Sequence, residues 1–551
     1  MCAQRDDHGA RQAVLPWLVR AVRRSQPGHP RRLPARAATP GNRHTASARG
    51  AGTPRRYRAS QRHTGREPDR RVGRLPTAIE GDAEGARPGA PAAAQWNGAA
   101  KDFGLRACTS QGSGIGTSPP QEVGVRDWLA ARAGKNDLKI NRIETVRVGE
   151  FPDLIWVQVH TDGRVVGLGE TWYAASGVEA LIHDHFGPLL IGQDPQEVEA
   201  HWTEMFKLSD HAGYGGAELR AISALDTALW DIKGQIAQKP VYELLGGPVR
   251  MQIRVYNTCG VYGQITDGYD VYRDPAGLAR SLLDEGVTAL KMSPTDYLAL
   301  ESRGQMLEPA DLEWALKPVR AIRDAVGMEI QIATDAHAKW NLPSAIRIVQ
   351  AFEPYEIMWH EELLSPLNEE SHRQLQDATR TPVCVAERLL TRYQFRRFIE
   401  NGSARIVMPD LVWTGGISET FKVGTLASAH QVPIAPHDCT GPVNMFACAQ
   451  ICMAVPGVMI MESNRAMTRG WYGRIVEPNI DIRDGFLHAP DRPGIGTRLR
   501  PEVRGRPDAV IRVSDEPREP WLWSMKRYTY PPPEIRAEIE ADRKRRRGGR
   551  A

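Results

Sequence analysis

The sequence predicts an α/β protein built mainly as a barrel of parallel strands and helices, with a smaller α+β domain before it. From Ile253 onward, eight short apolar runs alternate with amphipathic segments over about 210 residues, which is the length expected of a (β/α)8 barrel. Before Ile253 the pattern is different: strands in which apolar and polar residues alternate are followed by one clear helical period. The chain of 551 residues has room for both parts and for further segments at each end.

Residues 138–250 are predicted to form the α+β domain. Residues 140–151 and 154–160 show the apolar alternation of strands, and Asp162-Gly163 indicates a hairpin turn into a third strand at 165–172. A helical period follows. Its apolar positions are Ile222, Leu225, Leu229, Ile232 and Ile236.

Residues 251–470 are predicted to form the barrel. Its strands correspond to apolar runs at residues 253–259, 287–292, 329–334, 356–359, 383–386, 404–408, 432–435 and 458–461. Residues 471–530 are expected to form a proline- and glycine-rich segment that returns to the first domain. Residues 531–551 form a basic tail.

Residues 1–137 are predicted to be a disordered, arginine-rich extension. Residues 1–136 contain 22 Arg and 2 Lys against 10 acidic residues, a net charge of +14, which leaves −9 of the total of +5 for the rest of the chain. They show no sustained apolar period. A basic arm for nucleic acid or an acidic surface is one interpretation. Interleaved aromatic residues and nucleic-acid-binding motifs are absent, so we expect a dispensable extension and tail and no nucleic acid partner.

The composition excludes a chain that spans a membrane. No stretch approaches the ~20 apolar residues of a membrane helix, and Arg20 interrupts the early apolar patch before it reaches the length of a signal-peptide core. The seven cysteines are scattered and form no Cys-x-x-Cys pair, which argues against a disulfide framework. We therefore expect a cytoplasmic protein with no membrane partner.

Six ionisable residues follow predicted barrel strands at intervals of about 25 residues. They are Asp335, Glu361, Glu387, Asp410, His437 and Glu462. Because the C-terminal ends of barrel strands meet in one mouth, these side chains are predicted to converge. Buried carboxylates gather only where a cation neutralises them, and oxygen ligands favour a hard ion. Asp335, Glu361 and Glu387 are therefore predicted to bind Mg²⁺, with Mn²⁺ as second choice and Glu362 as the alternative to Glu361.

Two histidines are predicted to transfer protons. His337 lies two residues after Asp335, so both side chains face the same way on an extended chain, and it is suited to act as a general acid. His437 and Asp410 follow neighbouring strands. A carboxylate that binds an imidazole fixes its tautomer and stabilises its protonated form, which suits a general base.

Residues 138–499 resemble the enolase superfamily, and within it the mandelate racemase subgroup, especially acid-sugar dehydratases of the galactonate dehydratase type. The motifs that carry this resemblance are ALDTALWDIKGQ, TDAH, HEEL, VAERLLTRYQFR, MPDLVWTGGISE and APHDCTGP. The pairs Asp335/His337, Glu387/Arg388 and Pro436/His437 match the dehydratase type best. The resemblance implies an N-terminal α+β capping domain, a modified TIM barrel of (β/α)7β type and a homo-oligomer.

The resemblance also implies a reaction, the Mg²⁺-dependent dehydration of an aldonate or aldarate to a 2-keto-3-deoxy acid. It implies the following roles: Asp335, Glu361 and Glu387 as metal ligands; Asp410 and His437 as the proton-abstracting dyad; His337 as the acid; and Glu462 and Lys291 as partners of the substrate carboxylate or enolate. Substrate contacts are expected from Arg388, Trp413, Trp172 and Tyr173.

The second predicted strand departs from other branches of the superfamily. Racemases and lactonising enzymes carry Lys-x-Lys there, whereas this chain reads Lys291-Met292-Ser293, so Ser293 replaces their base. A cycloisomerase or epimerase of the same superfamily is the alternative function. A catalytically silent, basic-armed binding or regulatory protein is the alternative from another class. His360, next to Glu361, is predicted to turn away from the metal and to pack.

Overall fold

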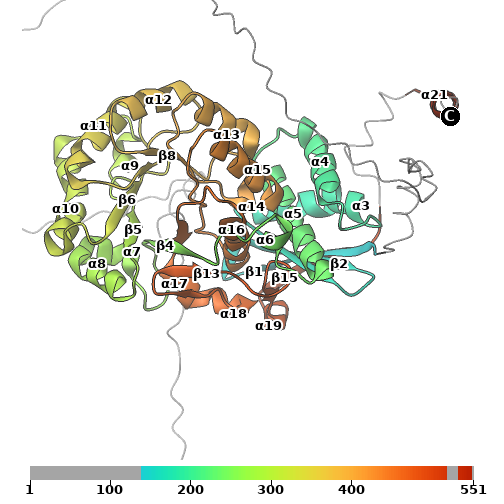
Figure 1. Cartoon of the computed structure of the whole chain (residues 1–551), viewed down its shortest axis with the longest axis horizontal. Helices are drawn as coiled ribbons and strands as arrows, with labels where there is room; N and C mark the ends of the chain where they lie inside the picture. The colour runs from blue at the N-terminus through green and yellow to red at the C-terminus, as the bar shows by residue number, and fades with distance from the viewer. Residues whose placement is uncertain (1–137, 518–530, 549–551) are drawn as a thin grey trace, which may run out of the picture. The chain divides into compact units, whose positions relative to one another are not determined.

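A computed structural model describes residues 138–517 and 531–548 (Figure 1). The extension predicted at residues 1–137 lies outside the described residues, as do residues 518–530 and 549–551. Within the predicted basic tail, residues Pro533–Gly548 form helix α21. Among the helices of the described part, none has the length and the apolar character needed to cross a membrane.

The N-terminal domain contains a four-stranded antiparallel sheet in the order β15-β1-β2-β3. Its strands are β1 (Ile140–Val148), β2 (Phe151–Thr161), β3 (Val166–Trp172) and β15 (Ala509–Ser514). The turn at Asp162-Gly163 joins β2 to β3 as predicted. The first strand was predicted to extend to Phe151, but Phe151 begins β2 and pairs with Val148, because the chain turns at the two residues between them.

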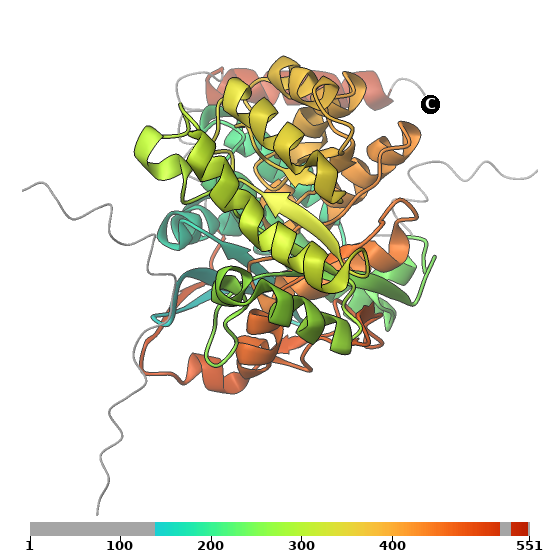
Figure 2. The same ribbon diagram turned by 90° about the vertical axis from the view of Figure 1, so that its left-hand side faces the viewer.

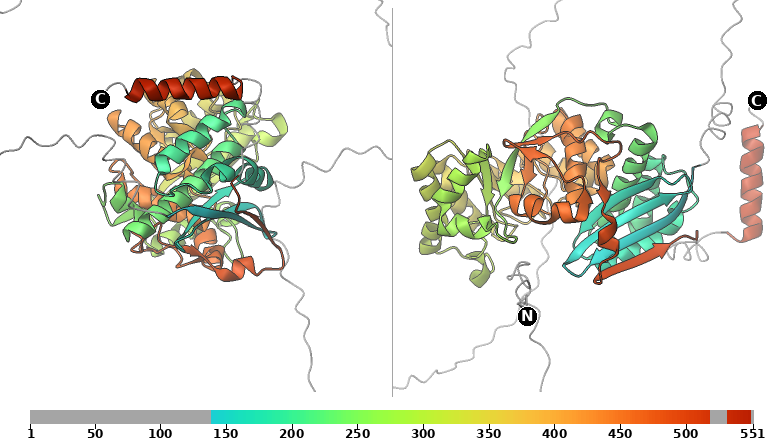
Figure 3. Two further views of the ribbon diagram at one scale, coloured as in Figure 1. Left: turned by 90° about the vertical axis from the view of Figure 1, so that its right-hand side faces the viewer. Right: turned by 90° about the horizontal axis from the view of Figure 1, so that it is seen from below.

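The helices of this domain cover one face of its sheet, as the right panel of Figure 3 shows. The main one is α5 (Ala217–Ala237), and the predicted positions Ile222, Leu225, Leu229 and Ile232 are all fully buried on it. Burying such an apolar stripe against a sheet is what stabilises an amphipathic helix in a domain of this kind. The other helices are α2 (Ala175–Leu181), α3 (Gly187–Leu190), α4 (Val198–Leu208) and α6 (Val241–Leu244).

The barrel is a closed ring of parallel strands. The first six are β4 (Gln252–Thr258), β5 (Ala289–Met292), β6 (Gln331–Asp335), β7 (His360–Glu361), β8 (Val383–Val385) and β9 (Ile406–Val407). The eighth, β10 (Met461–Ser463), pairs in parallel with β4 and closes the ring. At the seventh position, Ile434 forms isolated parallel bridges to Val407 and Val458.

Three predicted barrel strands differ clearly from those observed. The eighth begins only at Met461, where the predicted run 458–461 ends. No regular strand forms at 432–435, because Pro433 and Pro436 lack the N–H groups that a continuous ladder requires. The fourth strand begins at His360 rather than at Glu356. Glu356 has φ of 49°, in the left-handed region, and so extended pairing starts further along the chain.

The helices of the barrel ring the strands on the outside (Figure 1), and Figure 2 looks onto α8, α10 and α11. The helices that follow strands one to seven are α7 (Asp267–Arg273), α8 (Pro275–Asp284), α9 (Ala299–Ser302), α10 (Pro309–Val326), α11 (Leu342–Phe352), α12 (Glu369–Asp377), α13 (Thr391–Glu400), α14 (Leu411–Thr414), α15 (Gly416–Ala429) and α16 (Pro442–Ala454). The eighth strand is followed by one helical segment made of α17 (Arg465–Met467), the π-helical turn η4 (Thr468–Tyr472) and α18 (Gly473–Ile475), which leads out of the barrel into β11 (Val476–Glu477). This is the (β/α)7β arrangement that the resemblance implied.

The segment after the barrel contacts both domains. β13 (Phe486–His488), paired with β12 (Ile482–Arg483), adds antiparallel to the start of β4. β15 pairs antiparallel with β1. The remaining elements are β11 (Val476–Glu477), β14 (Arg498–Leu499) and α19 (Pro501–Arg504).

Hydrogen bonds join the N-terminal domain to the loop after the sixth barrel strand. Thr171 Oγ1 donates to the carbonyl oxygen of Val412 at 2.7 Å, and Trp202 Nε1 donates to that of Gly415 at 2.8 Å. The N–H of Gly415, whose φ is 127°, donates to Ser223 Oγ at 2.9 Å. These bonds hold α14, and with it Trp413, against the ends of β3 and α5.

Candidate active site

Carboxylates gather where β6, β7 and β8 end. Asp335 is the last residue of β6 and pairs in register with Glu361, the last residue of β7. Glu387 lies two residues beyond β8. All three side chains are buried, at 5%, 0% and 4% exposure. The register of the strands therefore brings these residues together at one mouth of the barrel, as predicted.

Lys291 of β5 lies among these carboxylates. Its Nζ is 2.8 Å from Glu361 Oε1, 2.9 Å from Glu462 Oε1 and 4.0 Å from Asp335 Oδ2. Burial alone would lower the pKa of this ammonium, but the charges of Glu361 and Glu462 outweigh burial and raise it well above its ordinary value. Lys291 is therefore a buried, permanently charged counter-ion to the carboxylates around it.

The carboxylate oxygens of Asp335, Glu361 and Glu387 are suitable ligands for a divalent cation, although each of these side chains is paired with a basic residue of the protein. Glu387 Oε2 is buried and has no hydrogen-bond partner among the described residues. Burial, with the neighbouring carboxylates, raises the pKa of Glu361 to about 7 against the opposing effect of Lys291. In the described part of the chain, no three His, Cys, Asp or Glu side chains are arranged to hold a metal as they stand. Asp335 is paired with His337 and Glu361 with Lys291 in this structure.

His337 is oriented by two aspartates. Its Nδ1 is 2.7 Å from Asp296 Oδ2, and its Nε2 is 3.1 Å from Asp335 Oδ2. Burial disfavours the imidazolium, but Asp335 and Asp296 outweigh burial and raise the pKa of His337 to about 9. The residue has φ of 45°, in the left-handed region, which costs a non-glycine residue roughly 1 kcal/mol or more. The two contacts therefore hold the imidazole ring beside the carboxylates, in surroundings that favour its protonated form.

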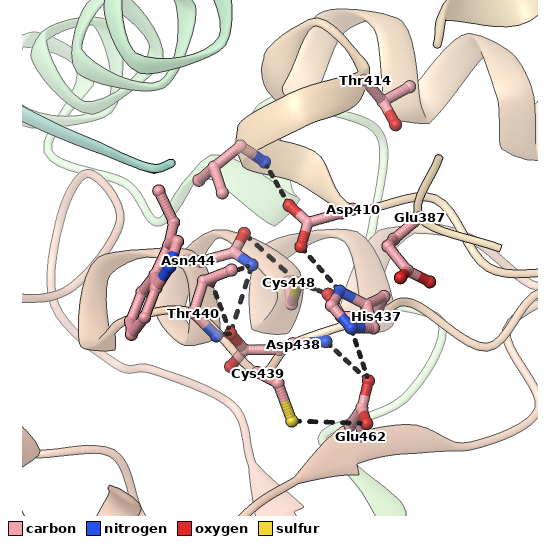
Figure 4. Close-up of polar contacts among 12 residues, drawn as sticks. Glu387, Asp410, Thr414, His437, Asp438, Cys439, Thr440, Asn444, Cys448 and Glu462 are labelled. Atoms are coloured by element: carbon pink, nitrogen blue, oxygen red, sulfur yellow. Dashed lines mark hydrogen bonds and ion pairs between the residues drawn. The ribbon is translucent and has the colours of Figure 1, made fainter. Parts of the chain in front are cut away.

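His437 and Asp410 form the predicted pair, shown in Figure 4. Nδ1 of His437 is 2.7 Å from Asp410 Oδ2, and Asp410 Oδ1 accepts the N–H of Val412 at 2.9 Å. The Nε2 atom of His437 lies 3.8 Å from Glu462 Oε2. Burial disfavours the charged ring, but Glu462 and the bond to Asp410 outweigh burial and raise the pKa of His437 to about 10.

Three groups fix the Glu462 carboxylate beside His437. The backbone N–H of Asp438 donates to Glu462 Oε2 at 2.8 Å (Figure 4), Lys291 pairs with Oε1, and Thr258 Oγ1 also donates to Oε1. Burial would raise the pKa of Glu462, but Lys291 and His437 outweigh it and lower the pKa to about 2. Glu462 is therefore an ionised carboxylate at neutral pH.

Glu361 and Glu362, the two candidate residues after the fourth strand, have separate partners. Glu361 contacts Lys291, whereas the side chain of Glu362 pairs with Arg388. Arg388 also reaches Glu387 Oε1 at 2.8 Å. The predicted substrate residue Arg388 is thus held by two glutamates. His360 faces the helix layer as predicted, because its Nδ1 is 2.7 Å from Thr334 Oγ1 and its ring packs edge-on against Phe352.

Aromatic side chains lie next to His437. The Trp413 ring centre is 5.6 Å from that of His437 and 5.5 Å from that of Tyr173. Tyr173 in turn lies 6.1 Å from Trp172. Tyr173 belongs to the loop after β3, so the N-terminal domain contributes an aromatic side chain within contact of the barrel mouth. Of the four predicted substrate residues, three therefore form a continuous aromatic group, and Arg388 belongs to the carboxylate group.

Sequence reasoning missed several neighbours of these residues. Asp296 follows the second strand by four residues, and Thr258 ends the first, so their positions beyond apolar runs could have suggested both. Asp438 was passed over because its backbone, not its side chain, contacts Glu462. Arg220 lies on α5 of the N-terminal domain, about 190 residues before its neighbour Trp413, and no pattern in the chain pointed to it.

Comparison with known proteins matches this architecture. The N-terminal domain model of mandelate racemase/muconate lactonizing enzyme matches residues 144–246, and an enolase C-terminal domain-like model matches residues 275–503. The chain is 32% identical over 372 residues to a D-galactonate dehydratase of Variovorax paradoxus, covering 66% of this chain and 93% of that protein. It is 28% identical over 402 residues to a D-xylonate dehydratase of Haloferax volcanii, covering 70% and 94%.

Solved structures give the same picture. An enolase of the mandelate racemase subgroup from Agrobacterium tumefaciens superimposes with a TM-score of 0.64 at 37% identity, over 68% of this chain and 99% of that one. The two family models, which match residues 144–246 and 275–503, between them cover every predicted site residue.

Proposed function

The chain belongs to the mandelate racemase/muconate lactonizing enzyme family of the enolase superfamily, and from this premise we propose that it is a hydro-lyase that dehydrates a sugar acid. The product of the proposed reaction is a 2-keto-3-deoxy acid. The names of the two dehydratase relatives support the reaction class. The main structural support is the arrangement of two histidines around the carboxylates at the ends of β6, β7 and β8. His337 is bound to Asp296, and His437 is bound to Asp410.

The proposed base is His437. Its Nδ1 is held by Asp410, so Nε2 is the nitrogen available to take the proton on the carbon next to the substrate carboxylate. Because Glu462 lies 3.8 Å from Nε2 and stabilises the charged ring, His437 becomes a base only when positive charge balances the carboxylates around it. Asp410 then stabilises the imidazolium that forms.

The proposed acid is His337. Its Nδ1 remains bound to Asp296 while Nε2, beside Asp335, gives its proton to the departing β-hydroxide. Its position after β6, four strands from His437 around the ring, allows proton removal and proton delivery from different directions. The enol that results tautomerises to the 2-keto-3-deoxy acid.

The proposed cofactor is Mg²⁺, with Mn²⁺ as the substitute, held by Asp335, Glu361 and Glu387. When bound, it supplies positive charge to the substrate carboxylate as the α-proton leaves. Lys291 adds a fixed charge next to the same carboxylates, and Glu462 is paired with its ammonium group. Ser293 at the end of β5 offers no second base, which disfavours racemisation, epimerisation or cycloisomerisation by a lysine.

The proposal is tested by incubating the protein and Mg²⁺ with a library of aldonic and aldaric acids. A semicarbazide or thiobarbiturate assay detects 2-keto-3-deoxy acids, and one positive compound identifies both reaction and substrate. If no acid reacts although Mg²⁺ binds, the dehydratase assignment fails and the cycloisomerase or epimerase alternative takes its place.

We expect His337→Asn to separate the two halves of the reaction. The variant lacks the acid that protonates the leaving hydroxide, so dehydration should fall roughly 10²–10⁴-fold. Exchange of the α-proton with D₂O, followed by NMR on the substrate, should continue because His437 and Asp410 are untouched. Loss of both activities in a folded, Mg²⁺-binding variant would mean that His337 has another role.

A further inference from the structure

An arginine without a carboxylate partner lies beside the aromatic group. Arg220, on α5, donates from Nε to the carbonyl oxygen of Trp172 at 3.0 Å. Its guanidinium carbon is 5.1 Å from the centre of the Trp413 ring. Among the described residues, no acidic side chain lies within ion-pair distance of Arg220, and neither of its terminal nitrogens has a hydrogen-bond partner.

Several other partly buried arginines of the described residues are neutralised by a carboxylate or donate several hydrogen bonds, whereas Arg254, away from the candidate site, also lacks a carboxylate and bonds through one terminal nitrogen. Arg465 binds both oxygens of Asp267, and Arg147 binds both oxygens of Glu179. Arg323 has no carboxylate but donates four hydrogen bonds to backbone carbonyls. Arg220 has only one such bond. Burial lowers the pKa of its guanidinium, and the charge of Asp410 offsets this only in part.

The surroundings hold Arg220 close to the reacting groups. It stacks on Trp413, and Trp413 in turn contacts the ring of His437 at 5.6 Å. The hydrogen bonds from Thr171 to Val412 and from Gly415 to Ser223 fix α14 against the N-terminal domain, so this spacing is set by the fold. A fork of free N–H donors next to an aromatic wall is suited to bind a planar carboxylate in bidentate fashion.

We propose that Arg220 binds a second carboxylate, at the end of the substrate opposite the one that is deprotonated, and that the enzyme therefore prefers aldarates to aldonates. This inference rests on the proposed dehydratase function and adds the substrate class. The metal-side carboxylate of the substrate faces Lys291 and the strand-end glutamates, whereas the far end lies towards Trp413, Tyr173 and Arg220. The terminal hydroxymethyl group of an aldonate would leave the guanidinium without its anion.

The test compares acids that differ only at the terminal carbon, for example galactonate with galactarate and gluconate with glucarate. The wild-type enzyme should show at least about tenfold higher kcat/KM on the diacid of the preferred pair. Arg220→Gln should reduce the diacid-to-monoacid ratio by about 10–100-fold, chiefly through KM, and Arg220→Lys should retain part of it. The matched control is Arg280→Gln, an exposed arginine of α8.

Three results would overturn the inference: a wild-type preference for the monoacid, an equal effect of Arg220→Gln on both acids, or an equal effect of Arg280→Gln. If no acid of any pair is dehydrated, the proposed function fails separately. In that case, calorimetry measures the binding of galactarate and glucarate in the presence of Mg²⁺ and tests whether Arg220 forms the carboxylate subsite. Diacid binding that weakens at least about tenfold in Arg220→Gln supports the subsite, and unchanged or absent binding rejects it.

Discussion

Replacement of His437 by asparagine is expected to abolish exchange of the α-proton of the substrate in D₂O and to reduce dehydration by roughly 10²–10⁴-fold. Asparagine keeps a hydrogen-bonding group near Asp410 but has no nitrogen that accepts a proton at neutral pH. The measurement is the loss of the substrate α-proton signal in proton NMR, together with product formation.

Mg²⁺ affinity should stay nearly intact in His437→Asn, because the three proposed ligands lie on other strands. The matched control is His430→Asn, an exposed histidine at the end of α15, which should exchange at the wild-type rate. Exchange that persists in a folded His437→Asn enzyme would show that another group removes the proton.

The strand ends of the barrel were predictable because barrel geometry is periodic. Each strand–helix unit has a similar length, so polar residues directly after apolar runs fall at the same mouth. This reasoning placed Asp335, Glu361 and Glu387 where the structure has them, and it paired Asp410 with His437. Their catalytic roles stay predictions, which the variants of His337, His437 and Glu387 test.

Details that depend on contacts between distant segments were not predictable. The seventh strand was expected from its apolar residues, but Pro433 and Pro436 restrict it to isolated bridges. Lys291 was ambiguous in the sequence, and only the closure of β10 onto β4 brings Glu462 to its ammonium group. The position of Arg220 follows from the way α5 packs on α14, which local periodicity does not encode.

Charge balance connects these contacts. In the structure, Lys291, His337 and His437 carry the positive charge that the buried carboxylates require, and each has a raised pKa as a result. A base must lose its proton and an acid must keep it, so the two histidines need different surroundings. A divalent cation next to Glu387 would oppose the charge of His437, and Asp296 would still favour the charge of His337.

Substitution of Glu387 by glutamine is expected to raise the Mg²⁺ concentration required for activity by at least about 100-fold. Glu387 Oε2 has no hydrogen-bond partner among the described residues, and burial raises the pKa of this carboxyl. An amide of the same shape removes the negative charge that a cation would otherwise neutralise. Isothermal calorimetry measures the change in Mg²⁺ affinity, and product formation at increasing Mg²⁺ measures its effect on turnover.

Thermal unfolding gives a second readout that does not depend on activity. Mg²⁺ at 100 times its Kd should stabilise the wild-type protein by about 2.7 kcal/mol, whereas the same concentration should leave Glu387→Gln almost unchanged. Without metal, the variant should unfold at or above the wild-type temperature, because the raised pKa of Glu387 indicates that Arg388 and the nearby histidines do not fully offset the cost of burying its charge. Glu329→Gln, an exposed glutamate before β6, should keep the full Mg²⁺ response. If Glu387→Gln also keeps it, Glu387 is not a ligand, and the remaining carboxylates would have to hold the cation by themselves.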